Sequence, residues 1–435
     1  MKSAVAYSVD AQQKGMISAI GKHIYYGWLI VAISLLNLMT LYGVWYSYSV
    51  FMVTLSGEFG WSRTVASSIF TLFTLVIALT SPLIGFCVDR YGSKKVLACG
   101  ALILAAGLFL CSKAGSTVSF YIFFGLIAGL GGSAIGLVGN SHAVANWFTE
   151  KRGLASGIAT SGIGLGMLVI VPMVQNWIQR YGWRDTFWIL ALLVAVVLIP
   201  VNLVFQRNRP VEPEADKDRD AGHVSSCSRH ELISICMGFP AIFKTHTFRR
   251  MFFVFFTGGL VVQAVLIHQV AIANDGGFRR QAIGIMIVLL GLCGIAGRMI
   301  WGMLSDLIGR KKAYLFASFT LSVGICLILA AKELHSQFAL FGYAVLFGTG
   351  YAAIAPLNWS VAADIYSGSR FGSIYGLLFM GTGLGAAVGP LLSGFVFDLS
   401  SSYVAAFILA VLCLFFSNRM ISKLYPKVLS CKEVK

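Results

Sequence analysis

The sequence is poor in charge. Only 11% of its 435 residues are Asp, Glu, Lys or Arg, whereas a soluble protein has about 25%. The nine cysteines form no CxxC pair and no Cys/His spacing typical of a metal site. The GxxxxGK[ST] loop of nucleotide-driven pumps is also absent. These absences predict a chain without metal, cofactor or nucleotide chemistry.

An enzyme active site is missing from the apolar stretches as well. An intramembrane enzyme needs a nucleophile–base pair or paired metal ligands, and the apolar stretches offer only single histidines and one arginine. Acidic residues are absent from the middle of every stretch. We therefore expect a protein that is not an enzyme. What the sequence does contain is hydrophobic surface, because 57% of its residues are hydrophobic.

One pattern occurs twice in this apolar background. Gly, Asp, Gly, Lys and Lys stand at offsets 0, 4, 7, 9 and 10 from Gly85, and again from Gly302, 217 positions later. Each copy lies between two long apolar stretches. An internal repeat of this kind is typical of membrane transporters that rock one half against the other.

Twelve apolar stretches are long enough to cross a bilayer, which takes about 20 helical residues. We predict an all-α membrane protein with twelve transmembrane helices in two pseudo-symmetric six-helix halves. The predicted spans are 25–50, 64–86, 96–113, 119–146, 153–178, 185–205, 250–273, 281–304, 313–331, 337–363, 372–396 and 403–424.

The positive charge gives the orientation. With loops assigned alternately to two sides, 25 of the 33 Lys and Arg residues fall on the side of both termini and seven on the other. This bias predicts that both termini are cytoplasmic, in a multi-pass protein of the plasma (inner) membrane. The formal charge of +16 is thus explained by topology, and we expect no nucleic acid partner.

Polar segments divide the chain into five parts. We expect a cytoplasmic N-terminal segment at 1–24 without a cleavable signal peptide, a six-helix half at 25–205 and a cytoplasmic linker at 206–249. A second six-helix half at 250–424 and a cytoplasmic tail at 425–435 follow. The linker mixes acidic and basic residues, and Glu231 to Phe243 could form a short amphipathic helix on the membrane surface.

The repeated loops predict a gate. We expect Asp89 and Asp306 to accept hydrogen bonds from the N-terminus of a neighbouring helix. Arg90, Lys94 and Arg310 are expected to pair across the loop or to contact anionic lipid. Such contacts exist only when the cytoplasmic side is closed, so these residues are predicted to set which conformational state is populated.

Arg298 is a basic residue well inside a predicted span, whereas Lys113, Arg250, Arg419 and Lys423 stand nearer the ends of theirs. A charge there costs at least ~2.5 kcal/mol by insertion scales, so it usually faces a cavity and is paired. Its planar guanidinium fits a carboxylate with two hydrogen bonds. The alternative is an arginine that extends to the headgroups or bonds to backbone carbonyls. We predict that Arg298 binds an anionic substrate.

Other polar residues within spans are candidates for the same cavity. Tyr46, Tyr351 and Asn358 lie in the interior of spans and offer hydrogen-bonding groups to a small carboxylate. His142 and His268 are candidates for proton coupling, because imidazole titrates near neutral pH, although a lone histidine is more often a packing residue. His268 is also expected to line the cavity.

The twelve spans, the central loop and the duplicated G-x3-D-x2-G-x-K-K motif resemble the major facilitator superfamily. Three stretches are similar to the oxalate/formate antiporters and the monocarboxylate transporters. The resemblance implies a small organic anion bound between the halves, with the span 8 arginine on its carboxylate. The three stretches are Tyr26-Gly27-Trp28, Asn146 to Gly157 and Gly297 to Asp306.

The same comparison shows departures. The resemblance places Phe379 and Thr382 of span 11 at the substrate, and Thr382 stands where the oxalate exchangers have a lysine. Gly294 replaces the aspartate that precedes the span 8 arginine of the animal monocarboxylate transporters, and Tyr46 replaces their span 1 lysine. One arginine without the span 11 lysine favours a substrate with a single negative charge.

The leading hypothesis is thus a secondary transporter of a small monocarboxylate such as lactate, pyruvate or formate, by proton symport or anion exchange. Its partners would be that carboxylate, membrane lipid and, for symport, protons. The alternatives are transport of another organic anion or drug-like amphiphile, and a transporter-shaped nutrient sensor that signals through residues 206–249. Import, export and oligomeric state are left open, and a monomer is compatible with the sequence.

Overall fold

The computed structural model describes residues 26–61, 63–148, 151–207, 239–366, 368, 370–400 and 402–429. This part of the chain is helical and contains no strand. In the N-terminal half the helices are α2 Tyr26–Phe59, α3 Arg63–Tyr91, α4 Ser93–Ser112, α5 Thr117–Phe120, η1 Tyr121–Ala128, α6 Gly129–Ile135, α7 Leu137–Trp147, α8 Arg152–Leu165, η2 Gly166–Ile170, α9 Val171–Leu193, η3 Val194–Leu198 and α10 Ile199–Val204. The remaining helices are α12 Phe239–Lys244, α13 His246–Asp275, α14 Arg280–Ile308, α15 Arg310–Leu334, α16 Gln337–Ala352, α17 Ile354–Ile365, α18 Phe371–Ser400 and α19 Val404–Leu429.

Eleven continuous helical segments of the described chain are long and apolar enough to cross a membrane. One of them, Arg152–Val204, is 53 residues long and is broken at Gly182, where φ is 81° and ψ is 169°. Glycine alone adopts this conformation at little cost, so the segment makes two passes. The described part of the chain therefore contains twelve passes, as the hydropathy pattern predicts.

The edges differ from the predicted ones. The first span, predicted at 25–50, continues as α2 to Phe59, because Phe51 and Leu55 are buried in the core of the N-terminal half. The range predicted as a linker, 206–249, contains α12 and the first residues of α13. The rest of that range from 208 to 238 lies outside the described residues, as do the termini at 1–25 and 430–435.

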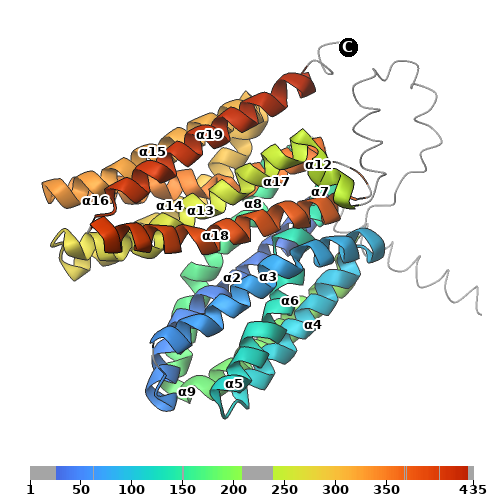
Figure 1. Ribbon diagram of the computed structural model, residues 1–435. Helices are drawn as coiled ribbons and strands as arrows, with labels where there is room; N and C mark the ends of the chain where they lie inside the picture. The colour runs from blue at the N-terminus through green and yellow to red at the C-terminus, as the bar shows by residue number, and fades with distance from the viewer. Residues whose placement is uncertain are drawn as a thin grey trace, which may run out of the picture.

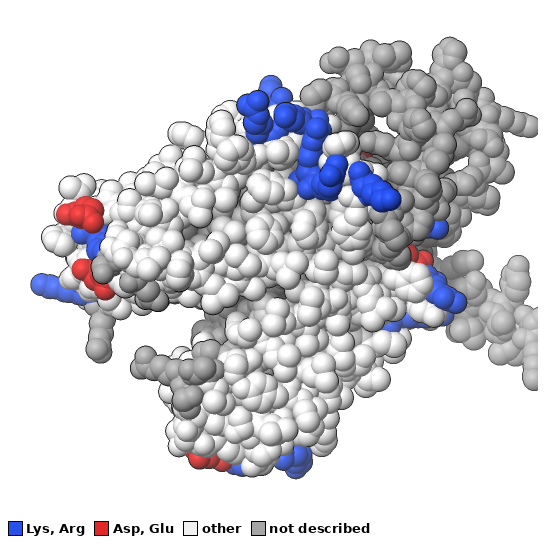
Figure 2. All heavy atoms as spheres, in the orientation of Figure 1, with Lys and Arg blue, Asp and Glu red and all other residues white. Residues whose placement is uncertain are grey.

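The two halves form a V (Figure 1). Helices α2 to α10 make the lower half and α13 to α19 the upper half, and the halves approach each other at the end that carries Asp89 and Asp306. We call this end the gate side. Toward the opposite end the halves diverge, and Figure 2 shows a hollow between them. The molecule is therefore closed on the gate side.

Glycines allow the close approach on the gate side. Helix α8 crosses α14 where Gly153 and Gly157 face Gly302, so that a side chain at Gly302 would collide with the Gly153 carbonyl. Helix α18 crosses α3 in the same way, with Gly376 against the backbone of Ser81. Small residues let helix backbones pack this closely in membranes. Closure thus depends on the absence of side chains at the two crossings.

The crossing predicts that Gly302→Ala opens the gate side. The added Cβ would lie 3.0 Å from the Gly157 Cα and closer still to the Gly153 carbonyl oxygen. Overpacking costs about 1–3 kcal/mol, which should raise the labelling rate of a gate-side cysteine, Ser360→Cys in a cysteine-free background, by roughly tenfold. Gly284→Ala is the matched control, because nothing lies within 4 Å of that position on the same helix. Equal labelling of the two variants would contradict this role of Gly302.

Candidate substrate cavity and gate

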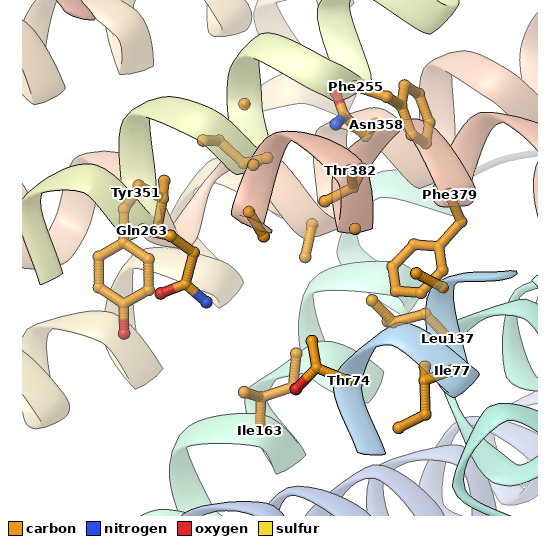
Figure 3. A pocket seen from close by; sticks show the side chains of 18 of the residues that line it. Thr74, Ile77, Leu137, Ile163, Phe255, Gln263, Tyr351, Asn358, Phe379 and Thr382 are labelled. Atoms are coloured by element: carbon orange, nitrogen blue, oxygen red, sulfur yellow. The ribbon is translucent and has the colours of Figure 1, made fainter. Parts of the chain in front are cut away.

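A cavity of about 180 Å³ lies between the two halves. Helices α2, α3, α7 and α8 line it from one half, and α13, α14, α16, α17 and α18 from the other. Its walls are mostly apolar and aromatic, and Figure 3 shows Thr382 and Phe379 of α18 facing Thr74 and Ile77 of α3. A pocket at the interface of two rocking halves is where a transporter binds its substrate.

Arg298 of α14 brings a positive charge into this cavity. It is 4% exposed, and in the described part of the chain no carboxylate pairs with it. One terminal nitrogen donates to the Gly294 carbonyl over 2.8 Å, and the guanidinium lies 5.3 Å from the centre of the Tyr351 ring. The buried Nε has no hydrogen-bond partner. The charge is therefore incompletely compensated by the protein.

Six of the seven residues predicted at the substrate lie together in the cavity wall. They are Arg298, Tyr46, Tyr351, Asn358, Phe379 and Thr382. The buried Asn358 Oδ1 also lacks a hydrogen-bond partner. An unsatisfied buried acceptor costs free energy until a donor reaches it. The wall thus contains a hydrogen-bond donor without a partner at Arg298 and an acceptor without a partner at Asn358.

His268 does not line this cavity, contrary to expectation. Its Nε2 lies 3.2 Å from the Pro390 carbonyl oxygen and its Nδ1 3.2 Å from the Tyr403 hydroxyl. Gln263, on the same helix, lines the cavity instead. Five residues separate Gln263 from His268, which corresponds to about 140° around an α-helix. When Gln263 faces the cavity, His268 must therefore point elsewhere.

Gln263 is one of several cavity residues that sequence reasoning missed. The signal was available, because Gln263 is the only polar side chain between Gly259 and Ile267. The rotation of α13 about its own axis determines whether Gln263 or His268 faces the cavity. That rotation is set by how the helix packs and cannot be derived from its composition. The other missed wall residues include Trp45, Thr74, Phe255 and Tyr42.

The two repeated aspartates bind helix N-termini of the opposite half. Asp89 accepts hydrogen bonds from the backbone N–H groups of Gly372 and Ser373, each over 2.7 Å, and from the Ser373 hydroxyl over 2.5 Å. Asp306 accepts from the N–H groups of Gly153 and Leu154 over 2.9 and 2.8 Å. The first N–H groups of a helix have no partner within the helix and carry partial positive charge. Each aspartate therefore joins one half to the other.

An ion-pair network reinforces the Asp306 contact. Arg310 binds Asp306 over 2.5 Å and Asp364 over 3.0 Å, and Asp364 also pairs with Arg152 of the opposite half over 2.7 Å. Arg152 and Asp364 were not predicted at the gate, because 212 residues separate them. The network adds a second link between the halves, from α8 to α17, beside the crossing of α8 and α14.

The other predicted gate residues are placed differently. Arg90 is exposed and its guanidinium lies 5.5 Å from the Tyr91 ring centre. For Lys94, the described residues show no partner across the gate. His142 is 8% exposed and lies at the gate rather than in the cavity, with Nδ1 2.9 Å from the Ser93 hydroxyl and Nε2 3.8 Å from Asp89 Oδ1.

The motif, the twelve passes and the interhalf cavity agree with the comparison to known proteins. The model of the Major Facilitator Superfamily matches residues 34–269 and 251–427. The chain belongs to the Major Facilitator Superfamily. This superfamily member is a multi-pass membrane transporter and not an enzyme.

Two curated relatives extend over most of this superfamily member. An uncharacterized MFS-type transporter of Bacillus subtilis, YcxA, is 26% identical over 387 residues, which cover 87% of this chain and 90% of the relative. Monocarboxylate transporter 4 of Gallus gallus is 26% identical over 364 residues, which cover 83% of this chain and 75% of the relative.

Solved structures share the fold. The proton:xylose symporter XylE superposes with a TM-score of 0.70 at 14% identity, covering 92% of this chain and 95% of that one. The human organic anion transporter MFSD10 superposes with a TM-score of 0.69 at 17% identity, covering 91% of this chain and 99% of that one. At these identities the likeness concerns the fold alone.

The gate geometry predicts that Asp89→Asn favours the state that is open on the gate side. The change removes the charge that faces the N-terminus of α18, an interaction worth up to ~2 kcal/mol when partly buried. A loss of ~1.4 kcal/mol shifts the ratio of the two states tenfold, so Ser360→Cys should be labelled roughly tenfold faster. Asp275→Asn, at the exposed opposite end of α13, is the control. Lost substrate binding with unchanged labelling would refute a gating role.

Proposed function

We propose that this protein is a secondary transporter that moves a small monocarboxylate across the plasma membrane by alternating access. The observation that carries the proposal is Arg298, a buried cation in the interhalf cavity without a carboxylate partner among the described residues. Relatives named monocarboxylate transporters, which match more than four-fifths of the chain, support it. The charge bias of the loops supports a cytoplasmic gate side.

The arrangement suits an anion with a single charge. Arg298 keeps free N–H groups after its bond to Gly294, and a carboxylate accepts two of them side by side. The described wall contains no second Lys or Arg, so a second carboxylate would be buried without a counter-charge. Burying an unpaired charge is costly. The aromatic and aliphatic wall would then hold the apolar part of the substrate.

Cavity size favours a small acid over the drug-like alternative. The volume of about 180 Å³ is below the roughly 300–1,000 Å³ that drug-sized ligands occupy. A small monocarboxylate therefore fits the cavity better than a drug-like amphiphile does.

Transport would couple binding to gate contacts. Substrate enters from the open side, neutralises Arg298 and lets the halves close around it, while the bonds of Asp89 and Asp306 must break before the gate side opens. The described wall of the cavity carries no Asp, Glu or His. Proton symport would therefore use a group outside the wall, such as His142 or His268, or the carboxyl group of the substrate itself. Uptake of labelled C1–C6 carboxylates into proteoliposomes, with a pH gradient or with internal carboxylate, separates symport from exchange.

Arg298→Gln should abolish substrate binding while leaving the fold intact. A ligand that binds the native state raises thermal stability in proportion to RT ln(1 + [L]/Kd). Lactate, pyruvate or formate should therefore stabilise the native protein and not the variant, and Arg298→Lys should respond weakly because an ammonium lacks the planar fork. Arg184→Gln, which removes an exposed ion pair with Glu58, is the control. The assignment fails if Arg298→Gln responds as the native protein does.

Thr382→Lys should move selectivity from mono- toward dicarboxylates. Thr382 of α18 lines the same cavity as Arg298, so the lysine adds a second cation near the substrate. Inhibition of labelled monocarboxylate uptake by oxalate and malonate should then increase by roughly tenfold, the equivalent of one modest ion pair. Thr382→Met supplies a side chain of similar length without charge. If oxalate and malonate compete equally against both variants, Thr382 does not face the second carboxylate.

A further inference from the structure

A second hollow lies on the outer surface of α12 and α13, away from the cavity. It has a volume of about 390 Å³ and is lined by Arg249 and five phenylalanines. Phe243 and Phe253 are 42% and 36% exposed. We call this hollow the phenylalanine groove. Its lining is Phe243, Phe248, Arg249, Phe252, Phe253 and Phe256.

Positive charge surrounds the groove. Arg249 is exposed at the edge of the phenylalanine groove, and Lys244 is the last residue of α12, five positions earlier. Arg250 donates to the Lys423 carbonyl over 3.4 Å, which brings the end of α19 beside the start of α13. Arg419 lies one turn before Lys423 on α19. Figure 2 shows basic side chains gathered over this end of the C-terminal half.

The two described segments that carry these basic residues have no negative charge of their own. Residues 239–274 and 402–429 contain no Asp and no Glu. Topology alone accounts for basic residues on one side of a membrane, but it does not require an aromatic groove beneath them. Clusters of four to eight basic residues beside a membrane helix attract anionic lipid headgroups, and the groove offers apolar surface for the attached chains.

We propose that the phenylalanine groove binds an anionic phospholipid from the gate-side leaflet, with Arg249 at the phosphate and the phenylalanines against an acyl chain. The occupant has to combine a negative headgroup with an apolar tail, and a phospholipid does so where α13 enters the membrane. The site is independent of the substrate proposed for the cavity.

The groove also contacts the moving parts of the protein. The Phe252 ring lies against Gly381 of α18. A Cβ added at Gly381 would be 3.0 Å from the nearest ring carbon of Phe252. Helix α18 carries Thr382 of the cavity wall and Ser373, which binds Asp89 at the gate. A lipid that holds Phe252 therefore acts on the helix that joins cavity and gate.

Native mass spectrometry of the purified full-length protein tests the site. With equal amounts of phosphatidylglycerol and phosphatidylcholine, the protein should retain phosphatidylglycerol preferentially. Arg249→Ala should lower that retention roughly fivefold, the effect of one basic residue near a lipid surface. Phe253→Trp should lower it by filling the groove without changing the charge. Arg279→Ala, exposed at the opposite end of the C-terminal half, should leave it unchanged.

Three results would each overturn the proposal. The first is equal retention of the two lipids by the native protein. The second is equal phosphatidylglycerol retention by the native protein and Arg249→Ala. The third is displacement of the lipid by glycerol phosphate, which has the headgroup charge without acyl chains, because the phenylalanines would then contribute nothing.

Discussion

A charge that is largely buried has to be compensated by the protein or by what the protein carries. Three side chains of this transporter meet that constraint in two ways. Asp89 and Asp306 are compensated by backbone N–H groups of the opposite half, so their compensation exists only while the gate side is closed. The Arg298 guanidinium donates to one backbone carbonyl and lies over one aromatic ring. Its charge is therefore incompletely compensated while no anion is bound. In the proposed function the two aspartates stabilise one conformational state, and Arg298 binds the substrate.

Asp89 and Asp306 bind helix N-termini in the same way, but additional ion pairs surround Asp306. Asp306 shares its crossing with the ion pairs of Arg310, Asp364 and Arg152. At the other crossing Asp89 is bonded to Ser373 and lies near the neutral or protonated ring of His142. The Asp306 crossing is thus linked by ion pairs as well as hydrogen bonds, whereas the Asp89 crossing is linked by hydrogen bonds. The two copies of the sequence motif therefore make contacts that differ chemically, with ion pairs at Asp306 and hydrogen bonds to Ser373 and Gly372 at Asp89.

The fold followed from sequence because its determinants are local or repeated. Apolar length defines each pass, and the repeat at Gly85 and Gly302 defines the two halves. Arg298 was recognisable because any charge inside a span is exceptional. The phase of a helix is harder to predict. Gln263 and His268 are both polar residues in one apolar span, and only packing against α18 and Tyr403 decides which of them faces the cavity. The Arg152–Asp364 pair was hidden for another reason, since it joins residues 212 positions apart.

The central claim is that Arg298 is compensated by the carboxylate of the substrate. A structure of the protein with (methylseleno)acetate, in which anomalous scattering locates the selenium, tests it most directly. We expect selenium density inside the cavity between the halves and a carboxylate within about 3 Å of the Arg298 guanidinium nitrogens. Selenium density at another place in the protein, with the guanidinium of Arg298 unchanged and bonded only to Gly294, would contradict the claim.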